Sequence, residues 1–312
     1  MLKHRCVSIL KQGDIFRDWL IAAAAQRISN KTCDVAVSKI LSSHTVCRYE
    51  FIGEGYSVVG KFFSEPTGHK RTYDFYLAMR HEWRTLKRLQ NIIDTPKPLA
   101  TMKDFNCVLL TEYVTGSPLS AVLNNEDDLI NKLYAVGKVL RKLHSITQRY
   151  YDKQADFHRF FTTLRDCNLE ASLRSRFSTL LQSWWGSDLL NQGYGCTIHG
   201  DASPSNYIFQ GNKCYAIDFE SSRNHANAVH DLGIMSAELT KHLIENNHAP
   251  MLAHPYIDSL LKGYSTNDTH FRKVRATLGF FVSLGLLRDA RFQNTNPYRP
   301  KLLQQALANL RL

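Results

Sequence analysis

Three polar residues suited to phosphate chemistry lie close together in the sequence. They are Asp201, Asn206 and Asp218. With His199, the first two give the spacing His-x-Asp-x-x-x-x-Asn, which is typical of a kinase catalytic loop. In such a loop the aspartate orients a hydroxyl and accepts its proton, while the asparagine holds a magnesium ion. The spacing therefore predicts phosphoryl transfer to a hydroxyl group.

A short β-hairpin is predicted to follow this loop and to carry Asp218. The apolar runs 207–209 and 215–217 predict two strands, and Gly211-Asn212 supplies a turn between them. We expect the hairpin to return Asp218 toward Asn206, so that two oxygen ligands share hard cations that bridge nucleotide phosphates. The expected cofactors are ATP (or GTP) and Mg²⁺.

The two motifs together resemble a known family. The residues from His199 to Asp201 with Asn206, followed by Ile217 to Glu220, are similar to the signature of the aminoglycoside phosphotransferase and choline kinase family. The alternative is a polar turn followed by an ordinary acidic strand end. The resemblance implies an α+β, bilobal protein-kinase-like fold, with a small β-rich N-terminal lobe and a larger helical C-terminal lobe.

The resemblance divides the chain into two domains. Residues 1–113 would form a nucleotide-binding lobe with an N-terminal helix, a five-stranded sheet and one further helix, and residues 114–312 a catalytic and acceptor-binding helical lobe. Hydrophobic periodicity and turn residues predict helices at 13–29, 72–89, 129–146, 234–246, 253–264, 271–288 and 301–312, and strands at 35–41, 46–52, 58–63, 99–103 and 107–113.

One lysine of the N-terminal lobe is expected to bind the nucleotide phosphates. Lys61, in the strand 58–63, falls where the family keeps this lysine. A lysine on a buried strand needs a partner, and the predicted partner is Glu82, with Asp74 as the alternative. A surface lysine on an edge strand and a solvated Glu82 are the other possibilities.

The turn that covers the phosphates is predicted at residues 41–45, where backbone amides and the hydroxyls of Ser42 and Ser43 would donate to phosphate oxygens. The turn contains no glycine, which is a departure from protein kinases. The run Gly55 to Lys61 fits most of a P-loop pattern, but Phe62 stands where the magnesium-binding Ser or Thr is required. We therefore do not predict a P-loop.

The run 109–116 resembles the hinge between the lobes of a kinase. The resemblance implies that the backbone of Glu112 and Val114 hydrogen-bonds the adenine edge. The alternative is an edge strand followed by a turn.

Two further residues are expected to hold the shape of the catalytic loop. His199 belongs to the loop itself, and Asp231 resembles the family's second buried aspartate, which accepts backbone hydrogens from the loop. Asp231 lies thirteen residues after Asp218, too close for the activation segment of a protein kinase, and no Ala-Pro-Glu follows. A protein substrate is therefore disfavoured.

The composition indicates a globular protein. Of 312 residues, 44% are hydrophobic and 21% charged, and no apolar run is long enough to span a membrane. Because Lys11 to Asp14 interrupts any signal-like segment, a cytoplasmic location is expected. The seven cysteines are scattered without a Cys-x-x-Cys pair, which favours reduced thiols over disulfides or a zinc site.

The net charge of +11 bears on possible partners. The basic residues are dispersed without a compact Lys/Arg run, so a nucleic-acid partner is disfavoured, and a generally basic surface explains the charge equally well. Enzymes that bind polycationic aminoglycosides are expected to present acidic surface near the pocket. The charge therefore tilts the prediction toward neutral or anionic sugar-type acceptors.

The sequence predicts a small-molecule kinase that transfers the γ-phosphate of ATP (or GTP) to a hydroxyl of a sugar, amino sugar, aminoglycoside or amino alcohol, with Asp201 as the catalytic residue. The alternative is a catalytically weak kinase-like protein that binds nucleotide or a partner in a regulatory role. Glu220 is left open as a metal contact or a helix-entry carboxylate, and the oligomeric state is not predicted. The acceptor contacts stay open among Ser236, Glu238, His242, Tyr264, Arg288 and Arg291.

Overall fold

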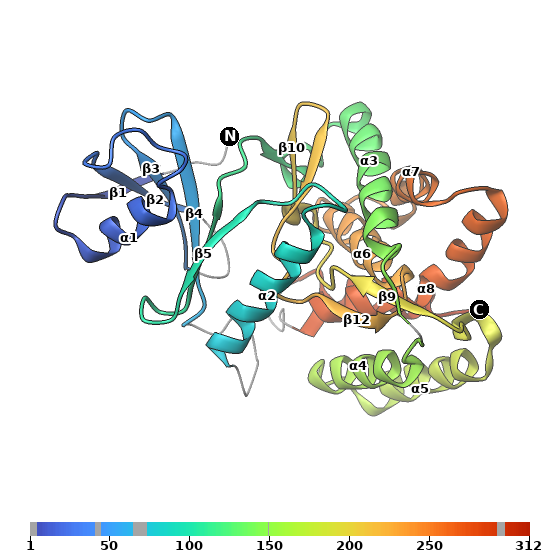
Figure 1. Cartoon of the computed structure of the whole chain (residues 1–312). Helices are drawn as coiled ribbons and strands as arrows, with labels where there is room; N and C mark the ends of the chain where they lie inside the picture. Colours follow the sequence, from blue (N-terminus) through green and yellow to red (C-terminus); the bar gives the residue numbers. More distant parts are fainter. Residues whose placement is uncertain (1–4, 41–44, 65–73, 149, 292–296) are drawn as a thin grey trace. The chain divides into compact units, whose positions relative to one another are not determined.

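The computed structural model describes residues 5–40, 45–64, 74–148, 150–291 and 297–312 (Figure 1). The chain forms two compact units. The N-terminal unit comprises Met1–Ser117 together with Ile208–Glu220, and the C-terminal unit comprises Pro118–Tyr207 and Ser221–Leu312. The division differs from a single boundary at residue 113, because the segment that carries Asp218 returns to the N-terminal unit.

An antiparallel sheet forms the centre of the N-terminal unit. Among the described residues it has six strands in the order β1-β2-β3-β4-β6-β5, and each neighbouring pair is antiparallel. The turn from β3 to β4 uses Gly53 and Gly55, whose φ values of 84° and 62° favour glycine. The strands are β1 (Arg5–Leu10), β2 (Val35–Ile40), β3 (Thr45–Phe51), β4 (Tyr56–Phe62), β5 (Pro98–Met102) and β6 (Val108–Glu112).

Strand β1 was not predicted from the sequence, and the predicted five-stranded sheet is wrong in this respect. β1 is an edge strand, with a bulge between Cys6 and Ser8 in its pairing with β2. Among the side chains of this strand that the structure describes, Val7 and Ile9 are exposed, and Leu10 packs against the core. The strand therefore lacks the alternation of buried and exposed residues by which a half-buried strand is recognised.

Helix α1 (Ile15–Ala23) packs on the sheet next to strands β2 and β3 (Figure 1). The Asp14 carboxylate caps the helix by accepting the backbone N–H of Arg17 at 2.9 Å. Its apolar stripe, with Leu20 fully buried, joins Val35 and Phe51 in one hydrophobic cluster. This cluster gives the sheet one dry face.

Helix α2 (Phe75–Leu89) carries a carboxylate within its apolar stripe. Met79, Leu86 and Leu89 are buried at helical spacing, and Glu82 lies on the same face with only 3% of its surface exposed. The helix packs against β5 and β6. Glu82 therefore enters the interior of the N-terminal unit.

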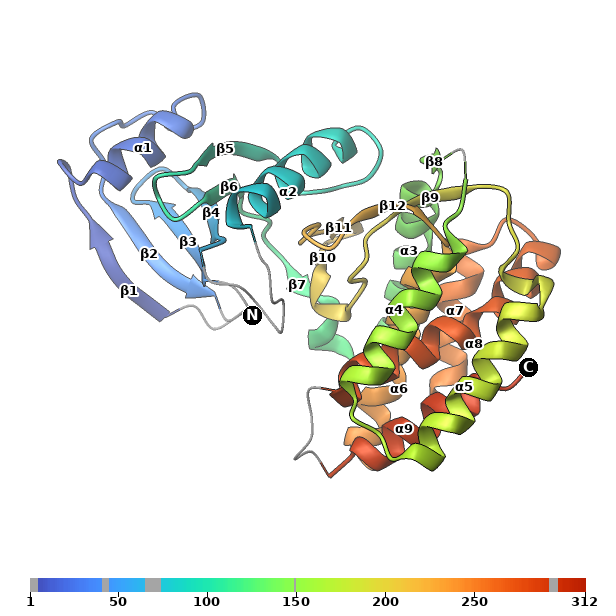
Figure 2. The ribbon, with the colours of Figure 1, turned by 90° about the horizontal axis from the view of Figure 1, so that it is seen from below.

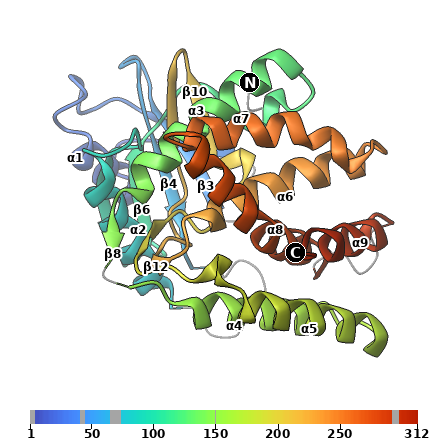
Figure 3. The ribbon, with the colours of Figure 1, turned by 90° about the vertical axis from the view of Figure 1, so that its right-hand side faces the viewer.

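Packed helices dominate the C-terminal unit. Helix α8 packs against α6 and α9, and α3 packs against α7 (Figures 2 and 3). The helices are α3 (Glu126–His144), α4 (Lys153–Asp166), α5 (Ala171–Gly186), α6 (Val229–Glu245), α7 (His254–Tyr264), α8 (Asp268–Arg291) and α9 (Arg299–Asn309). No helix in the described ranges combines the length and the apolar character needed to cross a membrane.

Short strands and 3₁₀ turns connect these helices. β9 (Gly195–Ile198) pairs with both β12 (Arg223–Ala226) and β8 (Thr147–Gln148). β10 (Tyr207–Gln210) and β11 (Lys213–Ala216) form the predicted hairpin around Gly211, and β7 (Ser117–Pro118) lies at the boundary between the units. The 3₁₀ turns are η1 (Leu119–Val122), η2 (Asp188–Leu190), η3 (Pro204–Asn206) and η4 (Pro250–Ala253).

Helix α6 begins earlier than predicted. Its first residue is Val229, not Ile234, because the Asn227 side chain accepts the Val229 backbone N–H at 2.9 Å. Asp231 therefore lies in the first turn of a helix, where the macrodipole favours a negative charge.

Two glycines allow α3 and α7 to approach closely. A methyl group at Gly137 would collide with the Leu260 carbonyl oxygen, and one at Gly263 would collide with the Tyr134 carbonyl oxygen. Their contact matters for the site, because α3 carries His144 and α7 carries Tyr264.

We predict that Gly137→Ala destabilises the protein by about 1–3 kcal/mol, the usual range for overpacking. Helix propensity alone would favour alanine by about 1 kcal/mol, so a loss of stability would report the collision. Gly186→Ala is the control, because a methyl group there meets no atom within 4 Å. Urea unfolding measures the free energy of unfolding of both variants. A Gly137→Ala protein as stable as the Gly186→Ala protein would contradict the packing argument.

Candidate active site

A buried lysine with three carboxylate partners lies in the N-terminal unit. The ammonium of Lys61, on strand β4, is 2.8 Å from Glu82 Oε2 and 2.6 Å from Asp218 Oδ1. It is also 3.3 Å from Glu220 Oε2. Sequence analysis predicted the pairing of Lys61 with Glu82, and the structure shows it. The alternative partner, Asp74, instead caps helix α2 by accepting the Leu77 backbone N–H.

The backbone around Asp218 positions the carboxylates of the hairpin. Ala216, the last residue of β11, donates its N–H to the Asp94 carbonyl at 3.0 Å. Asp218 then adopts a φ of 63°, in the left-handed region that non-glycine residues rarely occupy. The side chain of Phe219 is fully buried and anchors the segment between Asp218 and Glu220.

The four charged groups change one another's ionisation. Burial alone would lower the pKa of Lys61, but the carboxylates of Asp218, Glu82 and Glu220 raise that pKa above its usual value. Burial raises the pKa of Glu82, although Lys61 opposes the shift. The lysine is thus firmly charged, and three carboxylates share one positive charge.

The same carboxylates could hold a divalent cation. Ligand oxygens of Glu82, Asp218 and Glu220 lie within 4.8 Å of one another. Hard cations such as Mg²⁺ prefer oxygen ligands of this kind, and the excess negative charge of the group suits a cation. The donor set therefore fits the predicted magnesium ion.

Glu220 is not a helix-entry carboxylate. After Glu220 the chain enters a turn and strand β12, and helix α6 begins only at Val229. Of the two roles that the sequence left open, the structure therefore favours a contact with Lys61 or a cation.

In the C-terminal unit, Asp201 lies on the loop between β9 and the 3₁₀ turn η3. The Asn206 side-chain amide donates to the Asp201 backbone carbonyl at 2.8 Å and lies 3.3 Å from its carboxylate. The backbone N–H of Ser203 also donates to the Asp201 carbonyl, at 2.8 Å. Because the Asn206 amide nitrogen is directed at Asp201, its side-chain oxygen is directed away and can act as a ligand.

Asp231 holds the start of this loop. Its carboxylate accepts the backbone N–H groups of His199 at 2.7 Å and Gly200 at 2.9 Å. Gly200 has a φ of 83°, and a side chain there would collide with the Ser221 carbonyl. The loop conformation thus depends on a glycine and on one fully buried carboxylate.

Two histidines complete the coordination of Asp231. His144 Nε2 lies 3.0 Å from Asp231 Oδ2, and His230 Nδ1 lies 3.4 Å from Oδ1. The other ring nitrogen of His144 lies 3.2 Å from the Tyr264 hydroxyl. A neutral His144 that donates to Asp231 therefore accepts from Tyr264. Sequence analysis left Tyr264 among the possible acceptor contacts, and the structure assigns it, together with His144, to this network.

These contacts set the charge of the network. Burial would raise the pKa of Asp231, but hydrogen bonds from His144 and His230 hold that pKa well below its usual value. Burial and the nearby Arg223 lower the pKa of His230 to about 4. Asp231 is thus charged and His230 neutral near pH 7.

Arg288 is a neighbour of Asp201 that the sequence did not single out. Its guanidinium lies 2.8 Å from Asp201 Oδ1 and 3.3 Å from Glu238 Oε1. Arg288 and Glu238 were two of six possible acceptor contacts, and no sequence signal ranked them. The packing of helix α6, which carries Glu238, on helix α8, which carries Arg288, brings these two side chains together.

The predicted contacts with the adenine and with the phosphates from residues 42 and 43 are not established by the structure. Ser42 and Ser43 lie outside the described residues. Glu112 ends strand β6, and its N–H donates to the Lys97 carbonyl at 2.9 Å while its carboxylate pairs with Arg27 at 3.2 Å. That backbone N–H is thus engaged within the sheet. The roles of Glu112 and Val114 at an adenine edge stay predictions.

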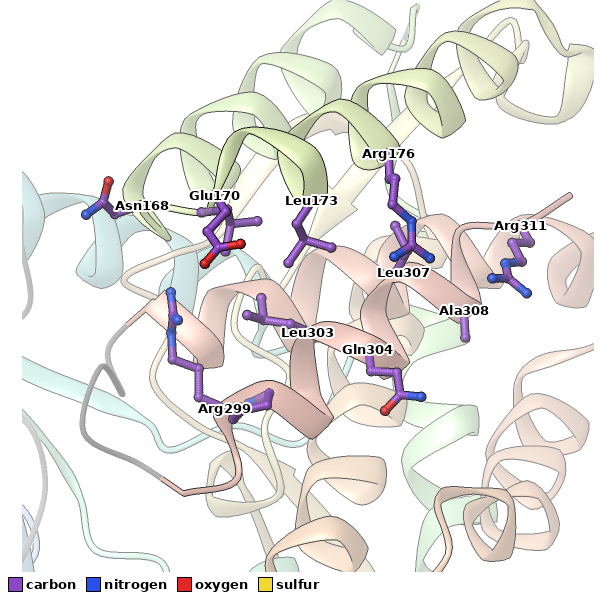
Figure 4. A pocket seen from close by; sticks show the side chains of 12 residues that line it. Asn168, Glu170, Leu173, Arg176, Arg299, Leu303, Gln304, Leu307, Ala308 and Arg311 are labelled. Atoms are coloured by element: carbon purple, nitrogen blue, oxygen red, sulfur yellow. The ribbon is translucent and has the colours of Figure 1, made fainter.

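A hollow of about 740 Å³ lies elsewhere in the C-terminal unit, between α5 and α9 (Figure 4). Leu173, Leu303 and Leu307 contribute apolar surface, while Arg176 and Arg311 add positive charge. None of the residues around Asp201 or Asp231 lines it. The hollow is therefore separate from the candidate site.

Residues 48–272 match the model of the phosphotransferase enzyme family. The chain belongs to this family. The predicted family resemblance is thus confirmed, and the match includes Lys61, Asp201, Asn206 and Asp218. Among curated protein sequences, none matches the chain.

Solved structures of phosphotransferases share the fold. A choline kinase from Cryptosporidium parvum Iowa II is similar with a TM-score of 0.62 at 14% identity, covering 94% of each chain. An ethanolamine kinase from Plasmodium vivax has a TM-score of 0.62 at 10% identity, covering 95% of this chain and 86% of the other. The GDP complex of aminoglycoside 2'-phosphotransferase-IIIa has a TM-score of 0.60 at 16% identity, covering 96% and 99%. These similarities confirm the predicted kinase-like α+β fold.

The lowered pKa of His230 predicts a pH-dependent stability. In the unfolded chain the imidazole binds a proton near pH 6.5, whereas in the folded protein it does so only near pH 4. The unfolded state thus gains protons first as the pH falls, and folding weakens by about 3 kcal/mol from about pH 6.5 to about pH 4.

Urea unfolding across this interval, compared between the wild type and His230→Gln, measures the contribution. We expect the variant to lose most of that pH dependence, whatever its stability at pH 7. Equal pH dependence in the two proteins would show that His230 is not held neutral in the folded state.

Proposed function

We propose that this phosphotransferase is a small-molecule kinase that uses Mg²⁺ and transfers the γ-phosphoryl group of ATP (or GTP) to an alcohol hydroxyl. The observation that carries the proposal is the buried Lys61, held by Glu82 and adjacent to the carboxylates of Asp218 and Glu220. A nucleotide bound with its metal ion would supply a partner for each kind of charge in this group. Its phosphate oxygens would bind Lys61, and the metal ion would bind the carboxylates.

The lysine would bind the α- and β-phosphates. Glu82 holds the ammonium of Lys61 in one place. Because Glu82 is almost fully buried, it binds the lysine from the interior and leaves the solvent side of the ammonium to the nucleotide. Asp218 is more exposed than Glu82 and would exchange its contact with Lys61 for the metal ion. When bound, Mg²⁺ would offset the charge that develops on the phosphate oxygens.

The catalytic loop would supply the remaining groups. Asp201 would orient the acceptor hydroxyl and take its proton, and its side chain keeps about a third of its surface exposed (35%). Asn206 would offer its side-chain oxygen to the metal ion, consistent with the orientation of its amide. The order of Asp201, Asn206 and Asp218 in the sequence supports their joint action on one nucleotide.

Related structures support the nucleotide but not a particular acceptor. Structures with this fold include a ternary complex of an aminoglycoside phosphotransferase with streptomycin and ATP, an ADP-bound aminoglycoside phosphotransferase and an aminopropanol kinase. We extend nucleotide use to this chain as part of the proposal. Sugars, amino sugars, aminoglycosides and amino alcohols all stay within it, because the catalytic core does not itself select the acceptor.

We predict that Asp201→Asn lowers kcat by about 10²–10⁴-fold, the usual contribution of a general base, and leaves nucleotide affinity within about threefold. A coupled ADP-release assay with a panel of hydroxyl compounds measures turnover, and calorimetry with ATP and Mg²⁺ measures affinity. Asp258→Asn is the control, since Asp258 pairs with Arg275 on the surface and should retain full activity.

Two outcomes would contradict the proposal. Full turnover by Asp201→Asn would remove Asp201 from the mechanism. Tight ATP binding without ADP release for any acceptor in the wild type would favour the regulatory, binding-only alternative.

A further inference from the structure

Arg288 places a positive charge at the predicted catalytic carboxylate. Its two terminal nitrogens contact Asp201 at 2.8 Å and Glu238 at 3.3 Å. Although burial opposes the charged form, Asp201, Asp289 and Glu238 raise the pKa of Arg288. The guanidinium is therefore charged at any pH at which the protein is folded.

A second cation, Lys241, lies close to two carboxylates behind Arg288. Lys241 lies 3.4 Å from Glu238 and 3.7 Å from Asp289. Burial and the nearby Glu238 raise the pKa of Asp289 to about 6. Arg288 and Lys241 thus offset two of the three negative charges of Asp201, Glu238 and Asp289.

The contact between Arg288 and Asp201 disfavours an ammonium group next to the acceptor hydroxyl. An acceptor hydroxyl must come within about 3 Å of an Asp201 carboxylate oxygen, and one of those oxygens is already in contact with the guanidinium. An amine close to that hydroxyl would face Arg288 at short range. Glu238, the other carboxylate in contact with Arg288, is shared between Arg288 and Lys241.

Arg288 keeps donors for a further partner. A guanidinium has five N–H groups in a planar fork that matches carboxylate and phosphate oxygens. The contacts with Asp201 and Glu238 use one nitrogen each, and a quarter of the side-chain surface of Arg288 (25%) stays exposed. An anionic group could accept the remaining hydrogens without displacing Asp201.

We propose that Arg288 determines acceptor specificity by binding an anionic group, a carboxylate or a phosphate, that the acceptor carries within a few bonds of the hydroxyl presented to Asp201. The inference rests on the proposed kinase function and narrows its acceptor class. As acceptors, it favours sugar acids, hydroxy acids and sugar phosphates over aminoglycosides and amino alcohols.

Acceptors matched in skeleton but not in charge test this preference. ADP release is measured with glycerate, glycerol phosphate, glycerol and aminopropanediol, and with gluconate, glucose 6-phosphate, glucose and glucosamine. The carboxylate and phosphate arms distinguish the two sources of negative charge. We expect at least about a tenfold higher kcat/KM for an anionic compound than for its neutral or amino counterpart.

Variants at Arg288 separate recognition from positioning. Arg288→Gln should lower kcat/KM for the anionic acceptor at least about tenfold more than for its neutral counterpart, mainly through KM, while Arg288→Lys restores part of the preference. Arg275→Gln, on the same helix and paired at the surface with Asp258, is the matched control and should behave like the wild type. An equal loss of kcat with every acceptor would show that Arg288 only positions Asp201 and would overturn the proposal.

A binding arm without nucleotide keeps this test independent of turnover. The same anionic compounds should raise the Tm of the wild type and of Arg275→Gln, but not of Arg288→Gln. A rise in Tm that depends on Arg288, without ADP release for any acceptor, would support the anion site and contradict the kinase function. A wild type that prefers neutral or amino acceptors, or that no anionic compound stabilises or serves as acceptor, would overturn the inference.

Discussion

The buried ammonium of Lys61 is the interaction on which the N-terminal unit depends. A charge in the interior is stable only when its hydrogen bonds and its countercharge are supplied there. The partners of Lys61 come from helix α2 and from the segment after β11, far apart in the sequence. The strand, the helix and the returning segment must therefore assemble together. This requirement is a physical reason for residues 208–220 to belong with the N-terminal unit.

A second buried charge organises the C-terminal unit in the same way. Asp231 receives hydrogen bonds from the catalytic loop on one side and from His144 and His230 on the other. Helices α3, α6 and α7 each contribute a residue to this network, since Tyr264 continues it beyond His144. The glycines that bring α3 close to α7 thus influence the catalytic loop, which belongs to neither helix.

The parts of the structure that the sequence predicted are those with a local signal. The loop spacing marks Asp201 and Asn206, and helical periodicity directs Glu82 inward toward Lys61. Edge strand β1 has no such signal, because its outward apolar side chains break the alternation. Arg288 reaches Asp201 only through the packing of α8 on α6, which no spacing along the chain reveals. The role of Glu220 likewise depends on a distance across the fold.

The central claim, that Glu82 holds Lys61 for the nucleotide, is tested most directly by a double-mutant cycle on ATP affinity in the presence of Mg²⁺. Calorimetry compares the wild type, Lys61→Met, Glu82→Gln and the double variant, with Lys87→Met on the exposed face of α2 as the control. We predict that Lys61→Met weakens binding by at least about tenfold, equivalent to about 1.4 kcal/mol, and that adding Glu82→Gln weakens it little further. Unchanged affinity in Lys61→Met, or effects of the two substitutions that simply add, would contradict the claim.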